Sequence, residues 1–78
     1  MADIDRIRWR CRRGLLELDL ILNRFLEIHF DRLDARQRDL FNQLLDESDN
    51  DLLDWTLGRK EPFESRYRPL VELLRTGL

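Results

Sequence analysis

The most apolar part of the chain, CRRGLLELDLILNRFLEIHF, runs from Cys11 to Phe30. Its apolar residues recur at i, i+3, i+4 and i+7, which predicts an amphipathic helix with a stripe of Leu18, Ile21, Leu22 and Phe25. Further apolar residues extend this surface most of the way round the helix: Leu15, Leu16, Leu20, Leu26, Ile28 and Phe30. A helix that is apolar on several faces must be covered by neighbours, so we expect it to be the central element.

A short helix is expected before this stretch. Its buried face is predicted from the spacing of Ile4, Ile7 and Cys11 at i, i+3 and i+7. Trp9 lies away from that face, beside a row of arginines on the opposite side: Arg6, Arg10 and Arg13. Gly14 then marks a turn into the central helix, because glycine in a helix interior carries a conformational penalty that a turn relieves.

Two further helices are indicated by their end signals. Asp34 and Gln37 fit a capping box that opens the third helix. An acidic turn ends it, and Ser48 or Asp49 then caps a short fourth helix. Gly58 is placed just beyond the last residue of this helix, where the left-handed backbone conformation is common.

A last helix and the composition complete the expected fold. Pro69 belongs in the first turn of the last helix, since in a helix interior it would lose a hydrogen bond and clash with the preceding turn. Only three Gly and two Pro occur in 78 residues, and Val71 is the sole valine, so helix formers dominate. We therefore expect an all-α fold, a compact five-helix bundle in which residues 1–78 form a single domain.

The net charge and its distribution indicate what kind of macromolecule the chain binds. The net charge of −2 removes the electrostatic argument for nucleic acid or an anionic membrane. The distribution is uneven, however, with five arginines and two aspartates up to Arg13. Farther along there is an acidic block without any basic residue: Asp46, Glu47, Asp49, Asp51 and Asp54. Such a dipolar surface suits a protein partner.

The cellular setting is predicted from cysteine content and hydropathy. A single cysteine allows no intramolecular disulfide, which indicates a reducing compartment. Charged residues interrupt the leucine-rich stretch, so no membrane insertion is expected, and the chain start shows no signal-peptide pattern. We expect a bacterial protein of the cytoplasm.

Catalytic chemistry finds little support in the sequence. His29 shares a helix face with Leu22 and Phe25 and is interpreted as a packed or rim histidine rather than a general base. Cys11 is interpreted as a small buried hydrophobe rather than a reactive thiol. No metal-ligand spacing, GxGxxG or P-loop is present, which argues against tight binding of a nucleotide or FAD. We predict a protein that is not an enzyme, with no catalytic residues, no metal and no tightly bound cofactor.

The arginine-rich segment around Trp9 is the strongest candidate for binding. Arginine with an aromatic residue could serve nucleic acid, but the third helix carries few basic residues and is followed by the acidic block, unlike a recognition helix. Trp and Arg also anchor protein interfaces. Gly14, beside an expected Arg13–Glu17 pair, would let another backbone come close. Equally, Gly14 could only end the helix and the pair could be an ordinary surface ion pair.

A family resemblance bears on this choice. The sequence Arg13-Gly14-Leu15-Leu16-Glu17-Leu18-Asp19, preceded by Trp9 and Cys11-Arg12, resembles the motif of the SdhE-type succinate dehydrogenase flavinylation factors, also called FAD assembly factors. The similarity continues through Phe41-x-x-Leu44-Leu45 and Asp49-x-Asp51-Leu52 with Trp55, and so covers nearly the whole chain.

The resemblance implies a chaperone-like assembly factor that promotes covalent attachment of FAD to the flavoprotein subunit of succinate dehydrogenase or fumarate reductase. The acceptor histidine would belong to that partner. By position, the residues implied to bind the partner are Arg8, Trp9, Arg13, Gly14, Glu17 and Asp19. The alternatives are a generic protein–protein adaptor with no role in flavin attachment, and a nucleic-acid binder whose affinity would fall steeply with salt.

Overall fold

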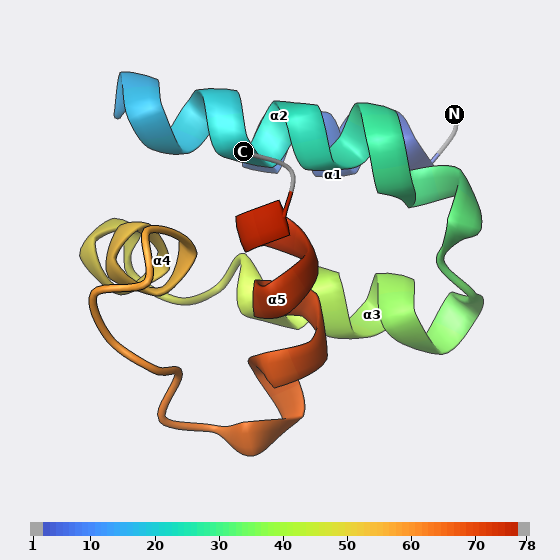
Figure 1. The fold of residues 1–78 in the computed structure, drawn as a ribbon. Coiled ribbons are helices and arrows are strands. Elements are labelled where there is room, and N and C mark those ends of the chain that lie inside the picture. The colour runs from blue at the N-terminus through green and yellow to red at the C-terminus, as the bar shows by residue number, and fades with distance from the viewer. Residues whose placement is uncertain (1–2, 77–78) are drawn as a thin grey trace.

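The computed structural model describes residues 3–76, which form helices joined by short turns (Figure 1). The α-helices are α1 (Asp3–Arg10), α2 (Leu16–His29), α3 (Ala35–Leu44), α4 (Asp49–Thr56) and α5 (Arg68–Thr76). Two 3-10 turns, η1 (Phe30–Arg32) and η2 (Ser65–Tyr67), precede α3 and α5. No β-strand occurs within residues 3–76, so the expectation of an all-α bundle of five helices is confirmed.

Helix α2 buries the apolar stripe that its sequence predicts. It packs against α4 and α5 (Figure 1). The side chains of the predicted stripe are all buried: Leu18, Ile21, Leu22 and Phe25, with Leu26 beside them. The Phe25 ring lies 4.9 Å from that of Phe41 between ring centroids, which ties α2 to α3.

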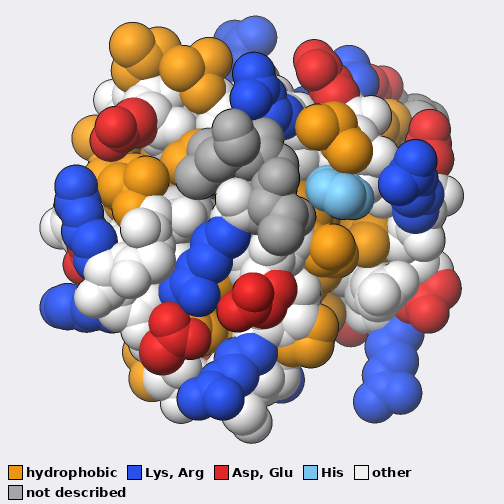
Figure 2. Space-filling view, in the orientation of Figure 1, with side chains coloured by type: hydrophobic (Ala, Val, Ile, Leu, Met, Phe, Trp, Pro, Cys, Tyr) orange, Lys and Arg blue, Asp and Glu red, His pale blue; other side chains and the backbone are white. Residues whose placement is uncertain are grey.

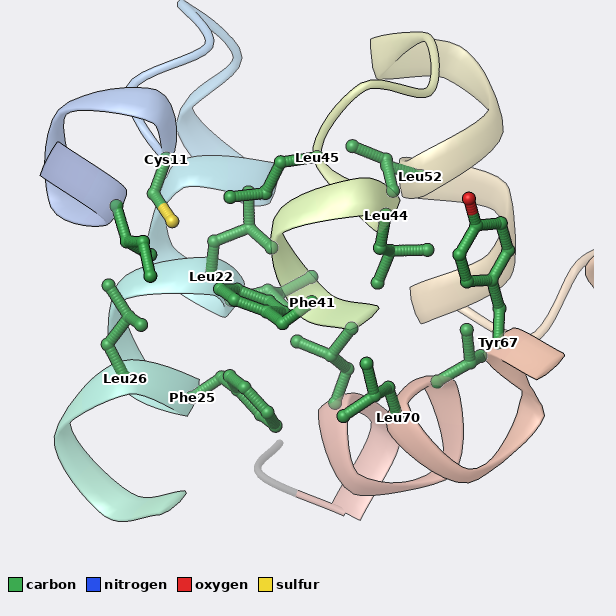
Figure 3. Close-up of a cluster of buried hydrophobic side chains, with 14 of the residues drawn as sticks. Cys11, Leu22, Phe25, Leu26, Phe41, Leu44, Leu45, Leu52, Tyr67 and Leu70 are labelled. Atoms are coloured by element: carbon green, nitrogen blue, oxygen red, sulfur yellow. The ribbon is translucent and has the colours of Figure 1, made fainter. Parts of the chain in front are cut away.

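The core collects apolar side chains from all five helices (Figure 3). Ile7 and the following Cys11 contribute from the first helix and its end, as their spacing predicts. Trp55 from α4 and Tyr67 from η2 are the largest fully buried side chains, with their ring centroids 6.1 Å apart. Each large apolar side chain buried in this way stabilises the fold by about 1.5–3 kcal/mol relative to exposure.

One expectation about α2 is wrong, because its neighbours do not cover it all round. Leu16 is 77% exposed, Leu20 is 63% exposed and Ile28 is 46% exposed. A chain of this length has too few residues to surround a helix that is apolar on several faces, so the other helices cover only the side of α2 that carries the buried stripe. Two leucines of the first half of α2 are therefore left on the surface.

The helix ends follow the capping signals in the sequence. Asp34 and Gln37 form the predicted capping box, each side chain bonded to the other residue's backbone N–H at 2.8 and 2.9 Å. Ser48, rather than Asp49, caps α4, and its Oγ accepts from the backbone N–H of Asp51. Gly58 has φ +76 directly after the C-cap of α4, as expected. Pro69 lies in the first turn of α5 and is also confirmed there.

Candidate protein-docking surface

The turn between α1 and α2 is built around Gly14. Its φ of +85 lies in the left-handed region, which confirms the predicted turn and explains the choice of glycine. The carboxylate of Asp19, in the first turn of α2, accepts from the backbone N–H of Arg13 at 2.7 Å and from that of Gly14 at 3.3 Å. Asp19 therefore holds the backbone of the turn against the start of α2.

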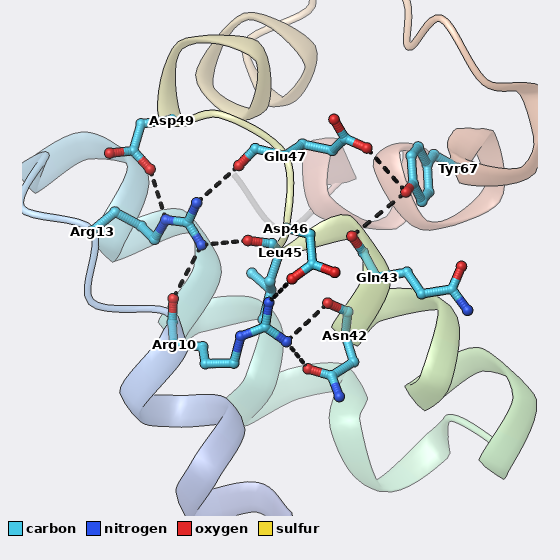
Figure 4. Close-up of polar contacts among 9 residues, drawn as sticks. All are labelled: Arg10, Arg13, Asn42, Gln43, Leu45, Asp46, Glu47, Asp49 and Tyr67. Atoms are coloured by element: carbon cyan, nitrogen blue, oxygen red, sulfur yellow. Dashed lines mark hydrogen bonds and ion pairs between the residues drawn. The ribbon is translucent and has the colours of Figure 1, made fainter.

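The side chain of Arg13 reaches the loop between α3 and α4 and the first residue of α4 (Figure 4). Its Nε donates to the carboxylate of Asp49 at 2.7 Å. Its Nη1 donates to the carbonyls of Leu45 at 2.7 Å and Arg10 at 3.3 Å, and its Nη2 donates to the carbonyl of Glu47 at 2.9 Å. Only 16% of the Arg13 side chain is exposed. This arginine is a structural link between two distant segments.

The expected Arg13–Glu17 pair is therefore wrong. Arg13 forms its ion pair with Asp49, while Glu17 stands exposed on α2. The physical reason is that the planar guanidinium group donates to one carboxylate and several backbone carbonyls at once where it lies. An ion pair with Glu17 would instead be a solvent-exposed surface pair, which stabilises a protein little.

Arg10 binds the same region of the acidic block. Its Nη1 donates to the carbonyl of Asn42 at 3.0 Å and to the Asn42 side chain, and its Nη2 pairs with the carboxylate of Asp46 (Figure 4). Two arginines of the predicted row thus face acidic residues of their own chain. Arg8 and Arg12 of the same segment are exposed and remain at the surface.

Trp9 is the most prominent side chain of the exposed part of this segment. It is 71% exposed, and the guanidinium of Arg12 lies 5.5 Å from the centroid of its ring. A large aromatic side chain that a folded protein leaves in water is unusual and is typical of binding surfaces. The placement of Trp9 away from the Ile7 face is confirmed.

Two shallow hollows connect Trp9 to the exposed side of α2. One, of about 380 Å³, is lined by Asp5, Arg8, Trp9, Arg12, Asn23 and Glu27. The other, of about 420 Å³, is lined by Glu17, Leu20, Ile21, Asn23, Arg24, Glu27 and Leu57. Because both include Asn23 and Glu27, they form one continuous surface across α1 and α2. We call Arg8, Trp9, Glu17, Leu20, Asn23 and Glu27, together with the exposed Leu16 one helical turn before Leu20, the α1–α2 surface.

The apolar part of this surface is visible in a space-filling view. Figure 2 shows hydrophobic side chains gathered at the upper left, over the first half of α2. Leu16 and Leu20 lie four residues apart and so stand on the same face of the helix. Sequence reasoning missed both as surface residues, and it also missed Asn23 and Glu27. For Asn23 and Glu27, the available signal was their position opposite the stripe of Leu18 and its partners.

The six residues singled out from the sequence thus separate into two groups. Arg8, Trp9 and Glu17 line the α1–α2 surface. Arg13 and Gly14 instead belong to the turn that joins its two helices, and Asp19 of α2 holds the backbone of that turn. All six residues therefore lie in one region, but three of them line the surface and the other three form or hold the turn between its helices.

A larger hollow lies on the other flank of α1. It has a volume of about 490 Å³ and is lined by Arg6, Ile7, Phe30, Leu33, Ala35, Arg38, Asp39 and Asn42. The guanidinium of Arg38 packs over the Phe30 ring at 4.3 Å and donates to the Phe30 carbonyl at 3.2 Å. Since it includes none of the six residues, we place the candidate site at the α1–α2 surface.

The two side chains considered for chemistry are packed, as interpreted from the sequence. Cys11 is fully buried, and burial raises the pKa of its thiol to about 12, against the opposing effect of the charges on Arg13 and Arg10. His29 is half-buried, with its ring 5.3 Å from that of Phe25. Residues 3–76 contain no cluster of potential metal ligands, and none of their helices is long and apolar enough to cross a membrane.

The family model and the curated relatives that match this chain belong to one family. The family described as flavinator of succinate dehydrogenase matches residues 5–77. A FAD assembly factor SdhE of Coxiella burnetii (strain RSA 493 / Nine Mile phase I) is 44% identical over 70 residues, which cover 90% of this chain and 85% of that protein. The FAD assembly factor SdhE of Legionella pneumophila (strain Lens) is 41% identical over 90% of this chain and 87% of its own length. The FAD assembly factor SdhE of Yersinia pestis is 37% identical over 91% of this chain and 81% of its own length.

No solved structure matches this chain. The chain therefore belongs to the family of succinate dehydrogenase flavinators.

Proposed function

We propose that this protein is an assembly factor that binds the flavoprotein subunit of succinate dehydrogenase, or of fumarate reductase, and promotes covalent attachment of FAD to it. The family and the names of the relatives support this function. The observation that carries it is the exposure of Trp9 and Leu20 on a continuous surface beside the turn in which the Arg13–Asp19 motif begins. Because the relatives named above come from bacteria, we place the function in the bacterial cytoplasm.

The client subunit would dock on the α1–α2 surface. Trp9 and Leu20 would be the apolar anchors, since exposed aromatic and aliphatic side chains lose the most water on docking. Arg8 and Glu17 would surround them as a polar rim that fixes the orientation of the complex. Gly14 is exposed, and apart from its two chain neighbours no residue has an atom within 4 Å of where a Cβ would be, so a client backbone has room to approach there.

The factor would act on the conformation of its client. Covalent attachment requires a histidine nitrogen of the client to approach the 8α-methyl of FAD in register, while negative charge develops on the flavin. A small protein that binds the ordered, closed form of the client more tightly than the open form shifts the population toward the closed form. In this proposal the chain supplies no reacting group, and FAD becomes attached to the partner without tight binding to this chain.

A reconstitution experiment tests the function directly. The chain is mixed with the apo flavoprotein subunit and FAD, samples are denatured, and covalent flavin is read by in-gel fluorescence against a reaction without the chain. We expect faster or fuller labelling with the chain. The Trp9→Ala, Glu17→Ala and Leu20→Ala variants should label more slowly, because each removes part of the α1–α2 surface.

Ile28→Ala is the matched control. Ile28 is an exposed apolar residue of the same helix, but it lines neither hollow of the α1–α2 surface. It should label like the wild type. Binding of the client without any gain in labelling would favour a plain adaptor over the assembly function. No binding to a competent client would refute the proposed docking altogether.

A further inference from the structure

We propose that the loop between α3 and α4, together with the first residue of α4, controls client affinity from outside the docking surface, through an ion pair between Asp49 and Arg13. Arg13 would then be a positioning residue and Asp49 its remote partner. This inference rests on the proposed function, because the affinity concerned is that for the flavoprotein subunit.

The docking surface is assembled from two helices, so its shape depends on the turn that joins them. Trp9 comes from α1, and Leu20 and Glu17 come from α2. Between these helices lie only residues 11–15, and Gly14 among them adopts a positive φ. A shift of this turn would change the separation of Trp9 from Leu20. A rigid client epitope could then not contact both anchors at once.

The turn is fixed from two sides. Asp19 holds its backbone from within α2. The Arg13 side chain holds it from outside by reaching Leu45, Glu47 and Asp49, which are 32 to 36 residues away in sequence. The second attachment joins the turn to a different part of the fold, and so it determines where the turn lies relative to the core.

The loop that receives Arg13 is itself firmly held. The carbonyl of Glu47 accepts from Arg13, while the carboxylate of the same residue accepts from the hydroxyl of Tyr67 at 3.2 Å (Figure 4). Tyr67 is only 1% exposed. The hydrogen bonds therefore run without interruption from the turn to a buried side chain of η2, which makes the loop a fixed anchor for the turn.

Arg13 is poorly placed to contact a client itself. A guanidinium has five N–H donors, and the hydrogen bonds to Asp49, Leu45, Arg10 and Glu47 engage four of them. With 16% of its side chain exposed, little of it can reach a partner. The contribution of Arg13 to docking should thus depend on Asp49, which lines neither hollow of the α1–α2 surface.

A double-mutant cycle tests this dependence. Affinity for the apo flavoprotein subunit is measured for the wild type, Arg13→Ala, Asp49→Ala and the double variant. Each single variant should bind about tenfold more weakly, equivalent to about 1.4 kcal/mol, and the double variant no more weakly than Arg13→Ala. Asp51→Ala is the control on the same helix, since the Asp51 contact with Ser48 uses its backbone N–H, and it should bind normally.

Two further measurements distinguish loss of the ion pair from unfolding of the variant. Asp49→Asn keeps the size of the side chain and removes its charge, and it should give part of the loss in a folded protein. Amide exchange at Gly14, which needs no client, should be faster in Asp49→Ala than in Asp51→Ala. Wild-type affinity in Asp49→Ala, or additive effects in the cycle, would overturn the inference and make Arg13 a direct contact. A wild-type chain that does not bind a competent client would instead overturn the proposed function, and unchanged exchange at Gly14 would then reject the positioning role as well.

Discussion

The carboxylate of Asp19 accepts a hydrogen bond from the backbone N–H of Arg13, six residues earlier, at 2.7 Å. The same carboxylate also receives the N–H of Gly14. No side chain caps α2 at its N-cap residue, Leu15, so Asp19 is the acidic group that joins the preceding turn to this helix. A residue that the sequence suggested as a client contact thus has a structural task that can be measured without any client.

Replacing Asp19 by alanine should lower the free energy of unfolding by about 1–2 kcal/mol, because two backbone donors lose a charged acceptor. Urea denaturation followed by circular dichroism measures this loss. Glu17→Ala is the control, since Glu17 is an exposed acidic residue in the same first turn and its removal costs only the favourable helix-dipole interaction. Equal losses in the two variants would show that the hydrogen bonds of Asp19 contribute nothing.

Replacing Gly14 by alanine should cost about 1–2 kcal/mol of stability, because the left-handed conformation is unfavourable for a residue with a Cβ. An added Cβ would meet no atom within 4 Å, so the cost is one of backbone conformation and not of steric overlap. Gly14→Leu should therefore be about as stable as Gly14→Ala. Thermal unfolding of both variants checks this, and a much less stable Gly14→Leu would contradict it.

The same pair of variants separates docking from folding. If a client backbone approaches Gly14, the leucine variant should bind the flavoprotein subunit more weakly than the alanine variant at equal stability. Gly58→Ala, at the other positive φ among residues 3–76 (+76), should lose similar stability but keep client binding. Equal client affinity of Gly14→Ala and Gly14→Leu would remove Gly14 from the proposed interface.

The buried thiol of Cys11 should make stability fall at alkaline pH. Its pKa is about 12 in the folded chain, against an ordinary value of 9.0. Between these values the unfolded chain has lost the thiol proton while the folded chain retains it. The stability contributed by this group is therefore fully present below pH 9.0 and is lost as the pH rises toward 12.

The alanine variant isolates this effect from other titrating groups. Relative to Cys11→Ala, the wild type should lose about 1.4 kcal/mol of unfolding free energy per pH unit across the upper part of that window. Denaturant titrations of both proteins at several pH values give the difference. Parallel pH profiles would contradict the prediction, as would rapid alkylation of Cys11 in the native protein at neutral pH.

The parts of the fold that could be predicted are those encoded by neighbours in sequence. The stripe of α2 repeats within a few residues, and the capping box of Asp34 and Gln37 lies within a single turn. Gly14 and Gly58 announce turns because few other residues adopt a positive φ. Each of these signals acts locally, so the sequence around it is enough to read it.

The role of Arg13 could not be read in this way. Two of the acceptors in the distant loop are backbone carbonyls, of Leu45 and Glu47, and carbonyls are common to every residue type. Glu17, four residues away, is the obvious ionic partner in a helix, whereas Asp49 becomes a neighbour only after the chain folds. The exposure of Leu20 could not be predicted either. Periodicity identifies the apolar faces of a helix, but it does not show which of them the rest of the chain covers.

The same substitution at two leucines of α2 should change stability by very different amounts. Leu22 is fully buried, so Leu22→Ala should cost about 2–5 kcal/mol of stability through lost contacts and the cavity left behind. Leu20 is 63% exposed, and Leu20→Ala should change stability by no more than about 0.5 kcal/mol. Thermal unfolding measures both values, and flavin labelling of the client should be slowed by Leu20→Ala in a fully folded protein. A Leu20→Ala variant with normal labelling would remove the apolar anchor from the docking surface, and one that unfolds like Leu22→Ala would show that this side chain is buried in solution.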